Sequence, residues 1–125
     1  SANEWPRFEL VLLGLGDDGH TASLFPGTAA LEESSRWFVA NWVEKLQTFR
    51  LTLTFPVLNN AVSVLFLVSG SGKSEILRQV LVGPAAQKFP AQRIQPLEGK
   101  LLWLIGQDAA AALLHEKTHP PLKLL

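Results

Sequence analysis

Near-continuous apolar runs are the feature of this sequence that most constrains its fold. Three of them, rich in Val, Leu and Phe and bounded by Gly, Pro or Asn, occupy residues 8–16, 63–69 and 101–106. Such runs are typical of strands buried on both faces of a sheet. Residues 73–82 switch to a helical period, with one apolar face made of Ile76, Leu77, Val80 and Leu81. Buried strands that alternate with helices predict an α/β fold with a mostly parallel sheet.

The remaining predicted elements are shorter. They are strands at residues 36–43 and 50–55, a short helix or turn at 56–61, and a helix at 108–117. In the second strand, Leu51, Leu53 and Phe55 alternate with Thr52 and Thr54, which predicts a half-buried strand. No internal repeat or low-complexity linker interrupts the pattern, so we expect residues 1–125 to form a single α/β domain.

The charge balance and composition exclude several classes of partner. Eleven basic residues match eleven acidic ones, so no global field favours nucleic acid or an anionic membrane. The chain contains no cysteine, which excludes disulfides and fits a reducing compartment. No apolar run approaches the roughly 18 residues of a membrane span, and the first ten residues do not resemble a signal peptide. We therefore expect a cytoplasmic location.

A glycine-rich turn with a lysine, GSGKS at residues 70–74, ends the second apolar run. It matches the end of a nucleotide-binding phosphate loop, but Leu67 stands where that pattern requires its first glycine. The turn is therefore too short to wrap a triphosphate. A glycine turn that leads into a helix can still hold a single phosphate, with Lys73 as its cation. The alternative is that Lys73 is a solvated side chain in the first turn of a helix.

Residues 14–19 match the dinucleotide-binding pattern G-x-G-x-x-G after a strand. A dinucleotide site also needs a long helix at this point and an acidic residue about 20 positions later. Pro26 and Gly27 stop any such helix, and Glu32 and Glu33 come too early. The match therefore does not predict a dinucleotide site.

The stretch LLGLGDDGHTASLFPG, residues 12–27, combines three close glycines with two carboxylates and a histidine. It follows a buried strand, and ligands of open α/β sheets bind at the carboxyl ends of strands. Asp18 is close enough in sequence to orient the His20 imidazole or to raise its pKa. His20 is thus a candidate general base for activating a water. Alternatively, Asp17 and Asp18 cap a short helix and His20 is a polar surface residue.

Two further histidines, His115 and His119, have the i,i+4 spacing of metal ligands. Pro120 takes residue 119 out of helical geometry, and the sequence offers no third ligand. We predict no metal site from them.

Three segments together resemble the 6-phosphogluconolactonases, within the wider group of sugar-phosphate isomerases and glucosamine-6-phosphate deaminases. The segments are GLGDDGHTASLFPG at 14–27, the strand and helix region at 50–81, and FPAQRIQP with GKLLWLIGQDAAAAL at 89–113. They occur in the order that the family shows. The resemblance implies a Rossmann-like parallel sheet flanked by helices.

The resemblance also implies an activity and its residues. The expected reaction is hydrolysis of 6-phosphoglucono-δ-lactone to 6-phosphogluconate, in the oxidative pentose phosphate pathway, with no metal or organic cofactor. By the family pattern, His20 is the base, Asp18 lies beside it and Lys73 contacts the substrate phosphate. Arg50 is a further phosphate candidate. The glycine turn, with Gly16 and Gly19, is expected to contact the substrate and to offer backbone N–H groups to an oxyanion.

The deaminase branch differs at one informative position. Deaminases of this group carry a glutamate before the proline of the motif, where this chain has Phe25 before Pro26. A phenylalanine cannot transfer a proton, so the residues favour a lactonase. Two other possibilities stay open, a non-catalytic module that binds a phosphorylated sugar and a purely structural remnant.

Members of the family are much longer, and the resemblance covers their C-terminal half. We therefore expect a protein truncated on the N-terminal side and weakly active or inactive by itself. A sheet truncated in this way has an unpaired edge, which predicts self-association or pairing with the missing half.

Overall fold

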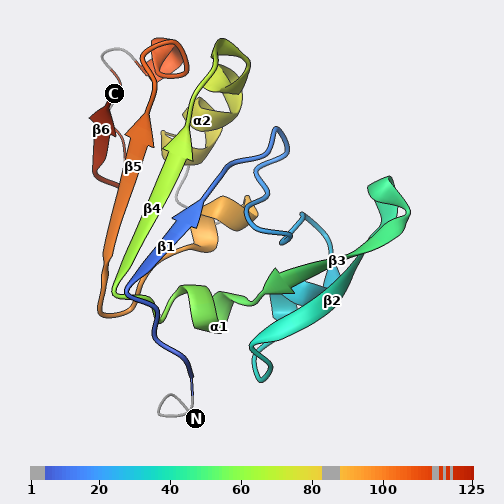
Figure 1. Ribbon diagram of the computed structural model, residues 1–125. Helices are drawn as coiled ribbons and strands as arrows, with labels where there is room; N and C mark the ends of the chain where they lie inside the picture. Colours follow the sequence, from blue (N-terminus) through green and yellow to red (C-terminus); the bar gives the residue numbers. More distant parts are fainter. Residues whose placement is uncertain (1–4, 83–87, 114–115, 117, 119) are drawn as a thin grey trace.

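A computed structural model describes residues 5–82, 88–113, 116, 118 and 120–125 of the chain. Its main sheet contains β1 (Leu10–Leu13), β4 (Ser63–Val68), β5 (Lys100–Ile105) and β6 (Leu122–Leu124), in the order β1-β4-β5-β6. All three pairings are parallel, so the carboxyl ends of the strands meet at one edge of the sheet (Figure 1). The prediction of an α/β fold with a mostly parallel sheet and flanking helices is confirmed.

The core lies between the sheet and its helices. Phe66 of β4 and Trp103 of β5 are register partners, and their rings stack at 3.8 Å between centroids. Helix α2 (Ser74–Leu81) buries the four apolar residues predicted for one face, Ile76, Leu77, Val80 and Leu81. One cluster of buried residues extends from Leu13 to Leu113 and includes Val39 of the hairpin described below.

Strand β1 is less buried than the sequence predicts. Only Leu13 of this strand is buried, whereas Leu10 and Leu12 are 54% and 56% exposed. The strand also ends earlier than the apolar run, at Leu13 rather than at residue 16. The reason is its position, because β1 is the edge strand of the described sheet and one of its faces has no covering layer there.

A separate antiparallel hairpin joins β2 (Phe38–Val43) to β3 (Thr48–Leu53) through a short 3-10 turn, η3 (Glu44–Leu46). Figure 1 places the hairpin beside the β1 end of the sheet, with α1 (Phe55–Leu58) between the two. Alternation of leucine and threonine usually indicates that the leucines are buried and the threonines are exposed. The structure shows the reverse for three of these residues. Thr52 and Thr54 are buried and Leu51 is 64% exposed.

The buried threonines have polar partners. The Thr54 hydroxyl donates to the Arg36 carbonyl at 2.7 Å, and the Thr52 hydroxyl accepts from the Ser23 N–H at 3.2 Å. Hydrogen bonds thus offset the cost of burying these hydroxyls. On the aliphatic face of β3, Leu51 is exposed and Leu53 is half-buried against the core.

The remaining short elements agree only partly with the sequence. Helix α1 begins at Phe55, one residue before the predicted start, and β6 was not predicted. The helix expected at 108–117 is instead a turn followed by one 3-10 helix, η6 (Ala111–Leu113), within the described residues. Residues 114, 115 and 117 of that prediction lie outside them. The other 3-10 helices are η2 (Ala29–Glu32), η4 (Ser71–Lys73) and η5 (Pro90–Arg93). Among the described residues, no helix has the length and apolar character needed to cross a bilayer.

Candidate active site

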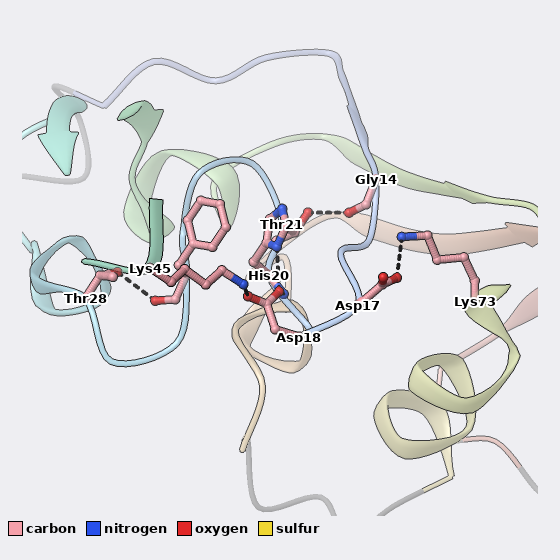
Figure 2. A network of polar contacts seen from close by, with 9 residues as sticks. Gly14, Asp17, Asp18, His20, Thr21, Thr28, Lys45 and Lys73 are labelled. Carbon is pink, nitrogen blue, oxygen red and sulfur yellow. Dashed lines mark hydrogen bonds and ion pairs between the residues drawn. The ribbon is translucent and has the colours of Figure 1, made fainter. Parts of the chain in front are cut away.

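The loop after β1 and the turn after β4 meet at the carboxyl edge of the sheet. Lys73 of the GSGKS turn donates from Nζ to Asp17 Oδ1 at 2.9 Å (Figure 2). The two motifs, 56 residues apart in sequence, are therefore side by side in space. This is the arrangement expected when parallel strands end at one edge, where open α/β sheets bind ligands.

Gly70 shapes the turn that presents Lys73. Its φ of 98° lies in the left-handed region, which a residue with a Cβ rarely adopts. The Gly70 N–H donates to Asp108 Oδ1 at 3.3 Å, which connects the turn to the end of β5. The chain then enters η4 and α2, so Lys73 stands at the start of a helix with its side chain directed at the β1 loop.

Asp18 holds the His20 imidazole in one orientation. Its Oδ1 lies 2.6 Å from His20 Nδ1 and also accepts the His20 backbone N–H at 3.1 Å. With Asp18 ionised, Nδ1 carries the proton of this hydrogen bond, and the lone pair of the neutral ring is on Nε2. The predicted proximity of the two side chains is therefore observed, in the geometry that a general base requires.

Asp18 itself is stabilised in its charged form. Partial burial opposes ionisation, but hydrogen bonds from Lys45 and His20 outweigh that effect and lower the pKa of Asp18 to about 2. Lys45 reaches the second carboxylate oxygen, Oδ2, from the η3 turn of the hairpin. Sequence reasoning missed Lys45, because it is 27 residues away and no local pattern connects it to the loop.

Two uncharged residues enclose the imidazole. The Phe25 ring stacks on the His20 ring, with centroids 4.0 Å apart and planes 25° from parallel. Gly16 lies against the ring so closely that a Cβ at this position would overlap the imidazole. Glycine is therefore required at position 16, because the imidazole lies too close for any side chain there. Phe25 is a buried apolar residue that packs on the ring.

The expected use of the glycine N–H groups needs correction. The Gly16 N–H donates to the His20 carbonyl at 2.9 Å, and the Gly19 N–H donates to the Gly16 carbonyl at 3.0 Å. Both donors are engaged within the loop, so the structure does not favour them as donors to an oxyanion. Gly19 instead has a φ of 82° and packs against Phe89, where a Cβ would have no room.

Side chains from the loop and the hairpin fix the rest of the segment. The Thr21 hydroxyl donates to the Gly14 carbonyl at 2.7 Å. The buried Asn41 amide of β2 bonds the Ser23 carbonyl, the Thr28 hydroxyl and the Ala30 N–H. Asn41 also escaped sequence reasoning, since its partners lie 11 to 18 residues away and no local pattern connects them.

Arg50 is not brought to this cluster. It lies opposite Asn41 in the hairpin, is exposed, and makes no side-chain hydrogen bond or ion pair with the described residues. His115 and His119 lie outside the described residues. Within the described part of the chain, no three His, Cys, Asp or Glu side chains are grouped so that they could hold a metal. The cluster thus offers an oriented imidazole, a partly exposed ion pair between Asp18 and Lys45, and the ammonium of Lys73.

Replacing Gly16 by alanine is expected to displace the His20 ring, because the new Cβ would occupy the position of the imidazole. Gly14→Ala is the matched control, since a Cβ there meets no atom within 4 Å. The His20 Nδ1 proton resonance, which hydrogen bonding to a carboxylate shifts downfield, should disappear or move in the first variant and persist in the second. An unchanged resonance in Gly16→Ala would show that the ring is not held as described.

The lowered pKa of Asp18 predicts a specific pH dependence of stability. A carboxyl group whose pKa falls from 3.8 to about 2 on folding stabilises the fold above pH 4, and this contribution is lost as the pH falls toward 2. After allowance for solvent screening, we expect Asp18→Asn to lower the free energy of unfolding by about 1 kcal/mol at pH 7. Urea titrations should show this difference shrinking between pH 4 and pH 2. A difference that does not depend on pH would contradict the assigned ionisation.

Comparison with known proteins identifies the family of this chain. The family of glucosamine-6-phosphate isomerases/6-phosphogluconolactonase matches residues 1–103. The chain is 47% identical to a 6-phosphogluconolactonase of Synechocystis sp. over 113 residues, which is 90% of this chain and 46% of that protein. It is 43% identical to the human 6-phosphogluconolactonase, covering 86% of this chain and 42% of the relative.

A solved structure of 6-phosphogluconolactonase from Trypanosoma brucei superposes with a TM-score of 0.75 at 31% identity, covering 86% of this chain and 43% of that one. The chain thus spans about half the length of the relatives it matches. With a family match over residues 1–103, this chain belongs to the glucosamine-6-phosphate isomerase/6-phosphogluconolactonase family.

Proposed function

We propose that this chain carries part of an active site that hydrolyses 6-phosphoglucono-δ-lactone to 6-phosphogluconate. The observation that carries the proposal is the contact between His20 Nδ1 and Asp18 at 2.6 Å, in a loop that Lys73 reaches from the next strand. A base and a cation at one edge of the sheet suit a neutral ester ring with an anionic phosphate. The relatives named 6-phosphogluconolactonase support the choice of substrate.

In the proposed reaction, His20 Nε2 accepts a proton from a water molecule, whose oxygen adds to the lactone carbonyl carbon. The resulting tetrahedral oxyanion collapses, and the bond between that carbon and the ring oxygen breaks. The ring oxygen takes the proton from the imidazolium, which restores the neutral base. One water is consumed and one carboxylic acid is formed. Asp18 stabilises the transient imidazolium and does not itself need to accept the proton.

Lys73 is proposed to bind the substrate phosphate. Its partner Asp17 is 85% exposed, so their ion pair is of the weak, screened kind. A phosphate dianion offers more charge and more acceptor oxygens than this carboxylate, and it can replace Asp17 as the partner of the ammonium. Gly16 and Gly19 are proposed to contribute through the shape of the loop, whereas Arg50 lies outside the cluster and is not proposed as a phosphate contact.

The position of Phe25 argues for lactone hydrolysis over deamination. The residue before Pro26 packs on the His20 ring, so the side chain nearest the base at this point has no proton to transfer. Hydrolysis of a lactone needs an activated water and does not need an acid that opens a sugar ring.

We propose that residues 1–125 form one domain equivalent to the C-terminal half of the relatives, supported by the single buried cluster. Since the chain spans about half the length of its relatives, we propose that its turnover in isolation is low. A cytoplasmic location is supported by the cysteine-free composition.

The proposed roles predict separable losses. Lys73→Gln should weaken binding of 6-phosphogluconate by about tenfold or more, because a charge-assisted bond to phosphate is worth about 1.5–3 kcal/mol. Lys100→Gln is the control, since Lys100 is exposed at the opposite end of the sheet. Titration calorimetry measures both. Equal binding by the two variants would contradict the role of Lys73.

His20→Gln should bind 6-phosphogluconate like the unchanged chain and lose any lactonase turnover above spontaneous hydrolysis. If the unchanged chain hydrolysed the lactone at the rate of a full-length relative, the proposed low activity would be contradicted. Binding with no turnover that depends on His20 would favour the alternative, a sugar-phosphate-binding module without catalysis.

We further propose that a second copy of the chain covers the exposed apolar surface beside β1. This surface is a groove of about 310 Å³ between the edge strand and the hairpin, with Leu12, Phe38 and Leu51 among its lining residues. All three are more than half exposed, and β1 has an edge that is unpaired in the described sheet. Contiguous exposed apolar surface next to an open strand edge favours association.

Self-association through this groove predicts that sedimentation of the purified chain gives a mass above that of one chain at micromolar concentration. Leu12→Lys should shift the mass toward one chain, because it places a charge in the groove. Leu97→Lys is the control, since Leu97 is 81% exposed and does not line the groove. A mass of one chain at every concentration for the unchanged protein would contradict the proposal.

A further inference from the structure

Lys45 pairs with Asp18 at this site but takes no part in the proposed reaction steps. It lies in η3, the turn of the β2–β3 hairpin, and its side chain extends to the loop that carries His20 (Figure 2). Its ammonium pairs with Asp18 Oδ2 and lies 5.2 Å from the centroid of the Phe25 ring. Lys45 thus contacts both side chains that touch the His20 imidazole, the carboxylate and the stacked ring.

The carboxylate next to Lys45 in the turn, that of Glu44, has other partners. Glu44 accepts hydrogen bonds from Trp42 Nε1 at 2.8 Å and from Gln47 Nε2 at 3.0 Å. Gln47 adopts a left-handed conformation with φ of 51°, and its N–H donates to the Glu44 carbonyl. The Glu44 carboxylate is therefore held by its other neighbours, and the Lys45 ammonium pairs with Asp18.

The two oxygens of Asp18 are divided between two tasks. Oδ1 accepts from the ring and the backbone of His20, and Oδ2 accepts from Lys45. An isolated carboxylate at 2.6 Å would strongly favour the protonated imidazolium, which has no lone pair for a water. The ammonium on the other oxygen balances that charge. The imidazole and the ammonium therefore share one carboxylate, each on its own oxygen.

We propose that Lys45 is a positioning residue that fixes the Asp18 carboxylate and keeps His20 neutral, as a base, near neutral pH. The role of His20 as a base rests on the proposed function. The effect of Lys45 on Asp18 and on the imidazole does not depend on it. The groups around the ring are Asp18 and Gly16 of the loop, Phe25 stacked on it, and Lys45 from the hairpin. The remaining nearby cation, Lys73, is paired with Asp17.

The test is the pKa of His20, followed by NMR of the imidazole nitrogens in the full 125-residue chain and assigned by comparison with His20→Gln. Lys45→Gln should raise the His20 pKa by about 1 pH unit, because one balancing charge near the ring is lost. Lys45→Arg keeps the charge and should restore the value of the unchanged chain. Lys88→Gln is the matched control, since Lys88 also lies over a phenylalanine ring, at 5.3 Å from Phe89.

The variants should fold, because Lys45 lies on an exposed turn and the substitution creates no cavity. A His20 pKa that is equal in Lys45→Gln, Lys45→Arg and the unchanged chain would overturn the proposal. So would the same shift in Lys88→Gln. Failure of the proposed function is a different result, since it would appear as lactonase turnover that survives in His20→Gln whatever the His20 pKa.

Discussion

The Asp18 carboxylate is the interaction on which the rest of the site depends. Its Oδ1 fixes the ring and the backbone of His20, and its Oδ2 binds Lys45 from the hairpin. One side chain therefore sets the orientation of the candidate base and joins the β1 loop to a separate part of the fold. A carboxylate can do this because its two oxygens accept several hydrogen bonds at once, and each bond to a charged group favours ionisation.

The two units of the fold make different contributions to this cluster. The parallel sheet brings the loop after β1 next to the turn after β4, which places Lys73 beside Asp17. The hairpin supports the same loop from the other side, through the buried Asn41 amide and through Lys45. Phe38, Phe49 and Leu51 are exposed on the outward face of the hairpin. The hairpin therefore forms hydrogen bonds and an ion pair with the loop on one face and has an apolar surface on the other.

Close packing explains why the loop needs its glycines. Gly16 leaves room for the imidazole, and Gly19 takes a left-handed conformation against Phe89 while its carbonyl accepts the Ala91 N–H at 3.0 Å. The FPAQRIQP segment thus supports the His20 loop from a distance of some seventy residues in sequence. The same interactions use the glycine N–H groups within the loop, which is why these glycines act through shape.

The sequence by itself determined the parallel α/β architecture, the buried face of α2, and the local pairing of Asp18 with His20. Each follows from a short-range pattern: apolar runs, a helical period, or a spacing of two residues. Only the tertiary structure decided which positions face solvent. It left Leu10 and Leu12 exposed on an edge strand, buried Thr52 and Thr54 against polar partners, and kept Arg50 out of the cluster. It also selected Lys45 and Asn41, because their contacts cross from the hairpin to a distant loop, and local patterns carry no information about such contacts.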